Sequence, residues 1–145
     1  MNWKEEAVSK LKNYGAMRSS LENLPLELKQ LELDARRIAG SDPGKVRVGG
    51  SVRSGEDALL SNLVHRQELE LALQQAKCWV DSVDRALHAL NGQEMTVLQR
   101  LYLQPERGGV DRLCQELAAE RSTVYRRRDE ALRRFTMAMY GRIDS

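Results

Sequence analysis

The sequence predicts an all-α protein in which a long antiparallel coiled-coil helical hairpin precedes a C-terminal helix-turn-helix domain. Composition, two heptad seams and three short amphipathic segments indicate this fold. Of the 145 residues, 41% are hydrophobic and 30% charged, but only 5% are aromatic and 3 are proline. Such a mixture favours long leucine-rich helices over sheets. No run approaches the length of apolar sequence that a membrane span needs, so we expect no membrane partner.

The first long helix is expected near residues 3–39. Asn2 followed by Glu5 is typical of a capping-box start. Pro25 lies inside the pattern, where it removes a backbone hydrogen bond and clashes with the carbonyl of Leu21, so a kink or short break is expected there. Apolar residues recur in alternating steps of three and four, the spacing of a coiled-coil seam: Tyr14, Met17, Leu21, Leu24, Leu28, Leu31, Ala35 and Ile38.

A glycine-rich linker over 40–54 is expected to lead into a second long helix near 55–90. The linker's basic residues, Lys45, Arg47 and Arg53, could contact DNA phosphates, although a plain connector is the favoured interpretation. Two helices with one apolar stripe each fold back most simply as an antiparallel pair, so residues 1–91 form the predicted hairpin. Pairing between molecules is the alternative that the sequence leaves open. The second seam comprises Leu69, Leu73, Ala76, Val80, Val83, Leu87 and Leu90.

Residues 92–145 are expected to form the second domain. Gly92 suits the left-handed position after a helix end, and Asn91 can cap the next helix together with Glu94. Amphipathic segments follow at 93–103, 110–119 and 121–139. A short helix, a tight turn and a longer arginine-rich helix have the layout of a helix-turn-helix.

Chemistry-bearing motifs are absent from the sequence, which predicts no catalytic residue, no metal site and no cofactor. His65 and His88 have no partners at metal-ligand spacing, and no phosphate-binding loop or hydrolase motif is present. Cys78 and Cys114 are interpreted as reduced cysteines of the core, and the N-terminus has no apolar signal core. We therefore expect a cytoplasmic protein that is not an enzyme.

The formal net charge of +2 conceals a local concentration of basic residues. Residues 121–134 contain six arginines against Asp129 and Glu130. Such a patch is typical of nucleic-acid binding, but a solvated helix face explains it about as well. Charge alone does not decide between these interpretations.

Residues 94–135 resemble the promoter-reading C-terminal domain, region 4, of sigma-70-type factors. That family has apolar residues at fixed spacing, then Ser-x-x-Thr-Val and a later Ala-Leu pair. In this sequence Ala118 stands where the family has glycine, Glu120 where it has a capping serine, and Arg128 where it has an apolar residue. The matching positions are Leu113, Leu117, Thr123, Val124, Ala131 and Leu132.

The chain as a whole resembles phage and prophage late-gene transcriptional regulators of the RinA/ArpU type. The resemblance implies a regulator that binds double-stranded DNA and acts with host RNA polymerase in the cytoplasm of a bacterial host cell. The first two turns of the helix from Arg121 would then enter the major groove, because that is where a helix-turn-helix meets the duplex. The expected DNA-binding residues are Arg121, Ser122, Thr123, Arg126 and Arg127. Helical spacing predicts that Leu117, Val124 and Leu132 are buried on the inner face of the motif, while Arg126 and Arg127 are exposed on the opposite face.

Two other functions remain open from the sequence. The first is a small terminase subunit, a DNA-packaging protein that pairs a helix-turn-helix with oligomerising helices. The second is a coiled-coil adaptor without DNA binding, in which the arginine-rich segment is only a solvated face. The hairpin is also a candidate site for homo-oligomerisation.

Overall fold

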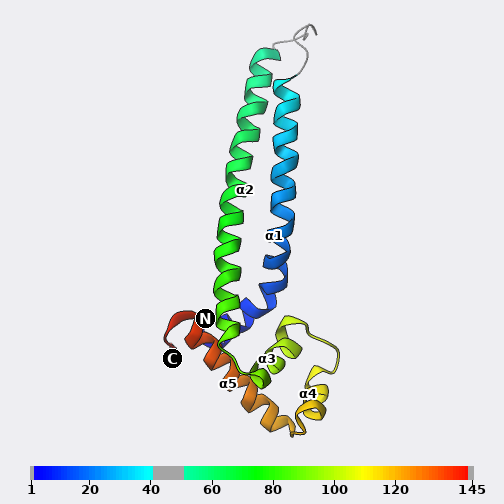
Figure 1. Cartoon of the computed structure of the whole chain (residues 1–145), viewed down its shortest axis with the longest axis vertical. Coiled ribbons are helices and arrows are strands. Elements are labelled where there is room, and N and C mark those ends of the chain that lie inside the picture. The colour runs from blue at the N-terminus through cyan, green and yellow to red at the C-terminus, as the bar shows by residue number, and fades with distance from the viewer. Residues whose placement is uncertain (1, 41–50, 144–145) are drawn as a thin grey trace. The chain divides into compact units, whose positions relative to one another are not determined.

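The computed structural model describes residues 2–40 and 51–143, and this part of the chain is helical without strands (Figure 1). The predicted all-α fold, a long helical hairpin followed by a helix-turn-helix, is confirmed. The helices are α1 (Trp3–Ala39), α2 (Ser51–His88), α3 (Gly92–Leu98), the π-helical turn η1 (Gln99–Leu103), α4 (Gly109–Leu117) and α5 (Arg121–Tyr140).

The linker differs from its predicted bounds. Lys45 and Arg47 lie outside the described residues, and α2 begins at Ser51, four residues earlier than expected. Its first turns run through Gly55, although glycine is a poor helix former. One interior glycine costs only about 1 kcal/mol. The cooperative extension of a long helix outweighs that amount.

The chain divides into two compact units, one of Met1–Arg18 with Cys78–Ser145 and one of Ser19–Lys77. The sequence instead placed a domain boundary between residues 91 and 92. The difference arises because the first turns of α1 and the last turns of α2 share a core with the C-terminal helices. Heptad spacing continues through both helices and gives no sign of this division.

In the Ser19–Lys77 unit, the segments of α1 and α2 run antiparallel beside each other (Figure 1). The helix passes through Pro25 without interruption, so the predicted possibility of a short break is wrong. The α1 side of the seam is only half-buried, because two helices cannot fully enclose the residues between them. Ser20 and Asp34 are half-buried beside it. All the predicted seam residues of this α1 segment are half-buried: Leu21, Leu24, Leu28, Leu31, Ala35 and Ile38.

Before Leu69, the seam of α2 continues towards the start of the helix with polar residues that were not predicted to belong to it. Asn62 is 8% exposed and donates from Nδ2 to the carbonyl oxygen of Leu31 at 2.8 Å. Arg66 Nε donates to Asn62 Oδ1, also at 2.8 Å. A polar side chain in a coiled-coil seam ties the two helices at one level. Asn62 therefore fixes the register of α2 against α1.

In the other unit, both long helices contribute to one core with α3 and α5. Ala7 and Leu11 of α1 are almost fully buried, and Phe135 of α5 is 1% exposed. Aliphatic and aromatic burial of this kind stabilises the packing by about 25 cal/mol for each Å² removed from water. The remaining buried members of this core are Val83, Ala86, Leu87, Leu98, Ala131 and Leu132. The prediction that Cys78 belongs to the core is wrong, because its side chain is exposed on α2.

The start of α3 is a complete capping box, as the sequence predicted. Asn91 Oδ1 accepts from the Glu94 amide at 2.8 Å, and Glu94 Oε1 accepts from the Asn91 amide at 2.9 Å. The left-handed conformation expected at Gly92 is wrong: the positive φ angles of the described residues lie at Gly108, Ala118 and Gly141. Since α2 ends at His88 and Asn91 is already extended, Gly92 simply begins α3.

Candidate nucleic-acid interface

The helix-turn-helix consists of α4 and α5 around a small apolar centre. Val97, Leu113 and Val124 have no exposed surface. Of the three residues predicted for the inner face of this motif, Val124 and Leu132 are buried and Leu117 is half-buried. Packing on this face directs the opposite side of the first turns of α5 towards solvent. The centre is completed by Leu101, Val110, Cys114, Leu117 and Ala119.

The turn between the two helices depends on a left-handed residue that is not glycine. Ala118 has φ 49° and ψ 49°, and it is the one non-glycine residue of the described chain with positive φ. The amide of Ala119 bonds to the carbonyl of Cys114 at 3.0 Å, a closure of the Schellman type. A left-handed L-residue costs about 1–2 kcal/mol. Ala118 therefore holds strain where the sigma-like pattern has glycine.

The N-terminus of α5 has no side-chain cap. Glu120 precedes the helix in an extended conformation and makes no capping hydrogen bond, and the first turn contains no acidic residue. The helix dipole places partial positive charge at this end. Ser122 is exposed and Thr123 is half-buried. The first turn of α5 therefore presents amide groups, a hydroxyl group and positive potential to its surroundings.

Two of the predicted arginines extend from this exposed part of α5. Arg126 is exposed, and within residues 2–40 and 51–143 no hydrogen bond or ion pair engages its guanidinium. The Arg121 side chain is 64% exposed and lies 3.6 Å from Asp111 of α4. Surface pairs of this kind contribute little to stability. Both guanidinium groups are therefore accessible to an external anion.

Arg127 lies differently from its prediction. Helical spacing predicted that Arg127 is exposed, but it is half-buried and its guanidinium donates to the side-chain oxygen of Gln93 in α3. Helical spacing alone cannot show this, because the partner comes from another element. Arg127 thus links α5 to α3 in the structure.

The other three arginines of the basic segment are engaged in contacts within the protein. Arg128 pairs with Asp129 at 3.0 Å and lies 5.0 Å from the ring centroid of Tyr125. Arg133 lies over the ring of Trp3. Arg134 pairs with Glu94 at 3.1 Å. Fewer arginines of this segment are therefore free to bind an external anion than its sequence suggests.

A network of charged residues supports the segment before α4 and was not identified from the sequence. Arg100 of η1 lies 3.2 Å from Glu116 and 3.9 Å from Glu106, which also pairs with Arg112. Gly108 takes a left-handed conformation just before α4, with φ 71°. The network thus connects η1, the 104–108 segment and α4. Surface pairs lie far apart in sequence, so periodicity gave no signal for them.

Two ionisable groups, Tyr102 of η1 and Asp129 of α5, have shifted pKa values. Burial raises the pKa of Tyr102 above its ordinary value, against the opposing effect of Arg128. Burial also acts to raise the pKa of Asp129, but hydrogen bonds from Arg128 and Lys4 outweigh it and lower that pKa overall. Asp129 is thereby favoured in its ionised form between two cations, Arg128 of α5 and Lys4 of α1.

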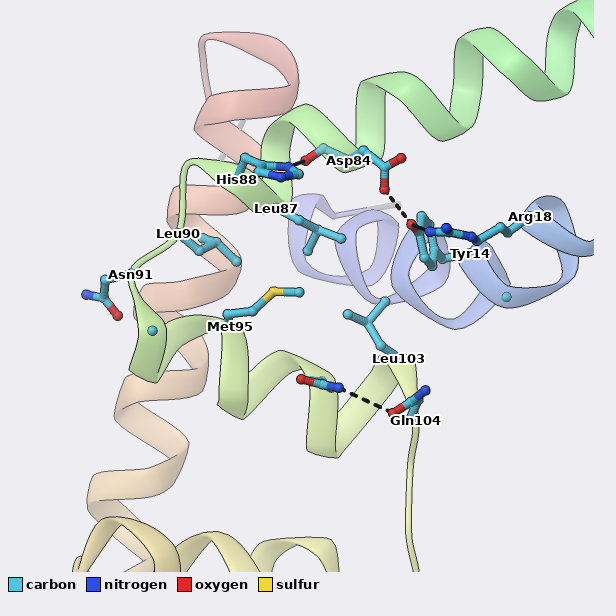
Figure 2. Close-up of a pocket in the computed structure, with 13 residues that line it drawn as sticks. Tyr14, Arg18, Asp84, Leu87, His88, Leu90, Asn91, Met95, Leu103 and Gln104 are labelled. Carbon is cyan, nitrogen blue, oxygen red and sulfur yellow. Dashed lines mark hydrogen bonds between the residues drawn. The ribbon is translucent and has the colours of Figure 1, made fainter. Parts of the chain in front are cut away.

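A cavity of about 780 Å³ opens beside α3 and η1, and Figure 2 shows its lining residues. The Tyr14 hydroxyl donates to the Asp84 carboxylate and accepts from Arg18 at 2.8 Å. Burial and the bond to Asp84 raise the pKa of Tyr14. Gln99 of the cavity lining donates to Gln104. The apolar wall of the cavity includes Leu87, Leu90, Met95 and Leu103. The cavity lining joins α1 and α2 to α3.

Among the described residues, no three His, Cys, Asp or Glu side chains cluster as metal ligands, and no helix has the length and hydrophobicity needed to cross a membrane. Comparisons of the chain with protein-family models, curated proteins and solved structures gave no match.

Proposed function

We propose that this protein is a sequence-specific regulator of transcription that binds double-stranded DNA through the first two turns of α5. The observation that carries the proposal is the position of Arg121 and Arg126, exposed on a helix whose opposite face is held by buried Val124. Arginine can bond guanine O6 and N7 bidentately, and it can also bind phosphate.

The remaining predicted residues have supporting roles in this proposal. Ser122 and Thr123 stand at the first turn, where short hydroxyl side chains reach the DNA backbone. Arg127 would exchange its hydrogen bond with Gln93 for a phosphate, a contact that positions the protein without reading sequence. No catalytic group, cofactor or metal takes part. The resemblance to late-gene regulators further assigns phage or prophage genes as targets, host RNA polymerase as a partner and the bacterial cytoplasm as the location.

The test compares two arginines of the same helix. Genomic DNA fragments bound by the full chain are selected and sequenced, and affinity for the enriched fragment and for random DNA is measured at several salt concentrations. Arg126→Ala is expected to weaken specific binding by about 1–3 kcal/mol if Arg126 reads a base. If it contacts phosphate, the salt slope falls by roughly one. Arg133→Ala, two turns further along, is the matched control and should bind like the parent.

The alternatives give different results in the same experiment. Absence of DNA binding at low salt would replace the proposal with the coiled-coil adaptor. Enriched fragments from a packaging site, together with a ring stoichiometry in native mass spectrometry, would indicate a small terminase subunit. Loss of binding in Arg133→Ala but not in Arg126→Ala would show that the groove assignment is wrong.

A further inference from the structure

The side of α2 that faces away from its seam carries a second apolar stripe, here called the outer stripe. It consists of Leu60, Leu63, Val64 and Leu71, which are 60%, 42%, 45% and 60% exposed. Leu60, Val64 and Leu71 lie on one helix face, since they are four and seven residues apart, and Leu63 flanks them. Gln67 stands between Val64 and Leu71. Exposed apolar side chains gathered on one face are typical of an interaction site.

Charged residues of opposite sign flank the outer stripe along the helix. Exposed Glu56 lies before it and exposed Lys77 lies after it, with Gln67 near the middle. Successive residues of a helix are turned by 100°. Glu56 and Lys77 therefore both lie on the same side of a line drawn along α2 through Gln67. The middle of this face is mixed, because exposed Gln67, Glu70 and Gln74 lie among the apolar residues of the outer stripe. Its two ends carry opposite charges and are therefore complementary when the helix is turned end for end.

We propose that two copies of this chain associate through their outer stripes, with the two α2 helices antiparallel about a two-fold axis at Gln67. In this register Leu71 of one copy lies beside Val64 of the second copy. Lys77 lies beside Glu56 of the second copy. Both contacts occur twice, as a two-fold interface requires. The proposal involves only residues of the Ser19–Lys77 unit and does not depend on DNA binding.

The first test measures association of the full chain without DNA by analytical ultracentrifugation. Leu71→Glu and Val64→Glu are each expected to raise the dimer dissociation constant at least about tenfold, since each buries a charge in the interface. Helicity measured by circular dichroism should not change, because both positions are exposed within one copy. Leu33→Glu is the matched control. Leu33 is an exposed leucine of α1, 44% accessible, and its replacement should leave association unchanged.

Charge reversal separates this register from any other use of the stripe. Glu56→Lys and Lys77→Glu should each weaken association, and the double variant should restore it, because the two residues oppose each other across the axis. In a chain with Cys78→Ser and Cys114→Ala, the variant Gln67→Cys should form a disulfide that joins position 67 of one copy to position 67 of the second copy. Ser61→Cys, on another side of α2, should not.

Three results would overturn the proposal. One is a chain that stays monomeric at every concentration. Another is association that survives both Leu71→Glu and Val64→Glu, or that Leu33→Glu abolishes equally. The third is charge reversal in which the double variant is no better than either single variant.

Discussion

Glu94 and Arg134 join the start of α3 to the middle of α5. Arg134 Nε lies 3.1 Å from Glu94 Oε2, while the other carboxylate oxygen of Glu94 accepts from the Asn91 amide. The Glu94 side chain is only 9% exposed, whereas that of Arg134 is 59% exposed. One buried carboxylate thus completes a helix cap and fixes the position of α5.

Replacing this carboxylate is the first prediction. Glu94→Ala is expected to lower the free energy of unfolding by about 1–3 kcal/mol, because it removes the reciprocal cap and leaves the Asn91 amide without its acceptor. Urea denaturation followed by circular dichroism measures the change. Glu130→Ala, at an exposed position of α5, should stay within about 0.5 kcal/mol of the parent. Equal stability of Glu94→Ala and Glu130→Ala would contradict this role.

The turn of the helix-turn-helix gives a prediction of the opposite sign. Ala118→Gly should raise the free energy of unfolding by about 0.5–1 kcal/mol, since glycine adopts the left-handed conformation without the steric cost, partly offset by its greater freedom in the unfolded chain. Thermal denaturation detects the shift. Ala119→Gly is the neighbouring control and should destabilise, because Ala119 has negative φ and packs on the motif's apolar centre. A lower melting temperature for Ala118→Gly would refute the strain.

Two nearby leucines of α1 test the hairpin seam. Leu28→Asp should destabilise the protein by about 1–3 kcal/mol, because a charge replaces a half-buried apolar side chain at the seam. Leu26 is 66% exposed, and Leu26→Asp should change stability by less than about 0.5 kcal/mol. Denaturant unfolding of both variants gives the comparison. Unchanged stability of Leu28→Asp would mean that the seam does not hold the hairpin.

Alkaline pH is expected to destabilise the protein through Tyr14 and Tyr102. Their pKa values are raised in the folded state above the ordinary value of 10.0, chiefly by burial. The folded state therefore prefers the neutral phenols. This contribution is fully present below pH 10.0 and is lost as pH rises through the folded pKa values. Unfolding free energies measured at neutral and increasingly alkaline pH should show the loss.

The double variant Tyr14→Phe, Tyr102→Phe provides the control for this pH effect. Phenylalanine does not ionise, so the alkaline decrease in stability should be shallower in this variant. Around neutral pH, where neither tyrosine ionises, the free energy of unfolding of the variant should differ from that of the parent by a constant amount. A decrease equally steep in both proteins would show that other groups cause it.

The sequence could predict much of the candidate interface, but not which arginines remain accessible. The resemblance and the helical spacing placed Arg121 and Arg126 on the first two turns of α5, and both are exposed there. Spacing also predicted that Arg127 would be exposed, which is wrong, since its partner Gln93 lies on another helix. Side-chain pairing between elements depends on three-dimensional distance, and residue type at a fixed spacing carries no record of it.

By itself, the sequence determined the local features of this protein: the two helices with heptad seams, the Asn91–Glu94 cap and the burial of Val124. Each depends on residues within a few turns of one another. Only the tertiary structure decided that Ala7 and Leu11 share a core with Phe135, that Asn62 bonds to Leu31, and that Ala118 is left-handed. These features arise when apolar faces distant in sequence pack together, because the energy of packing overrides local preferences such as the cost of a left-handed alanine.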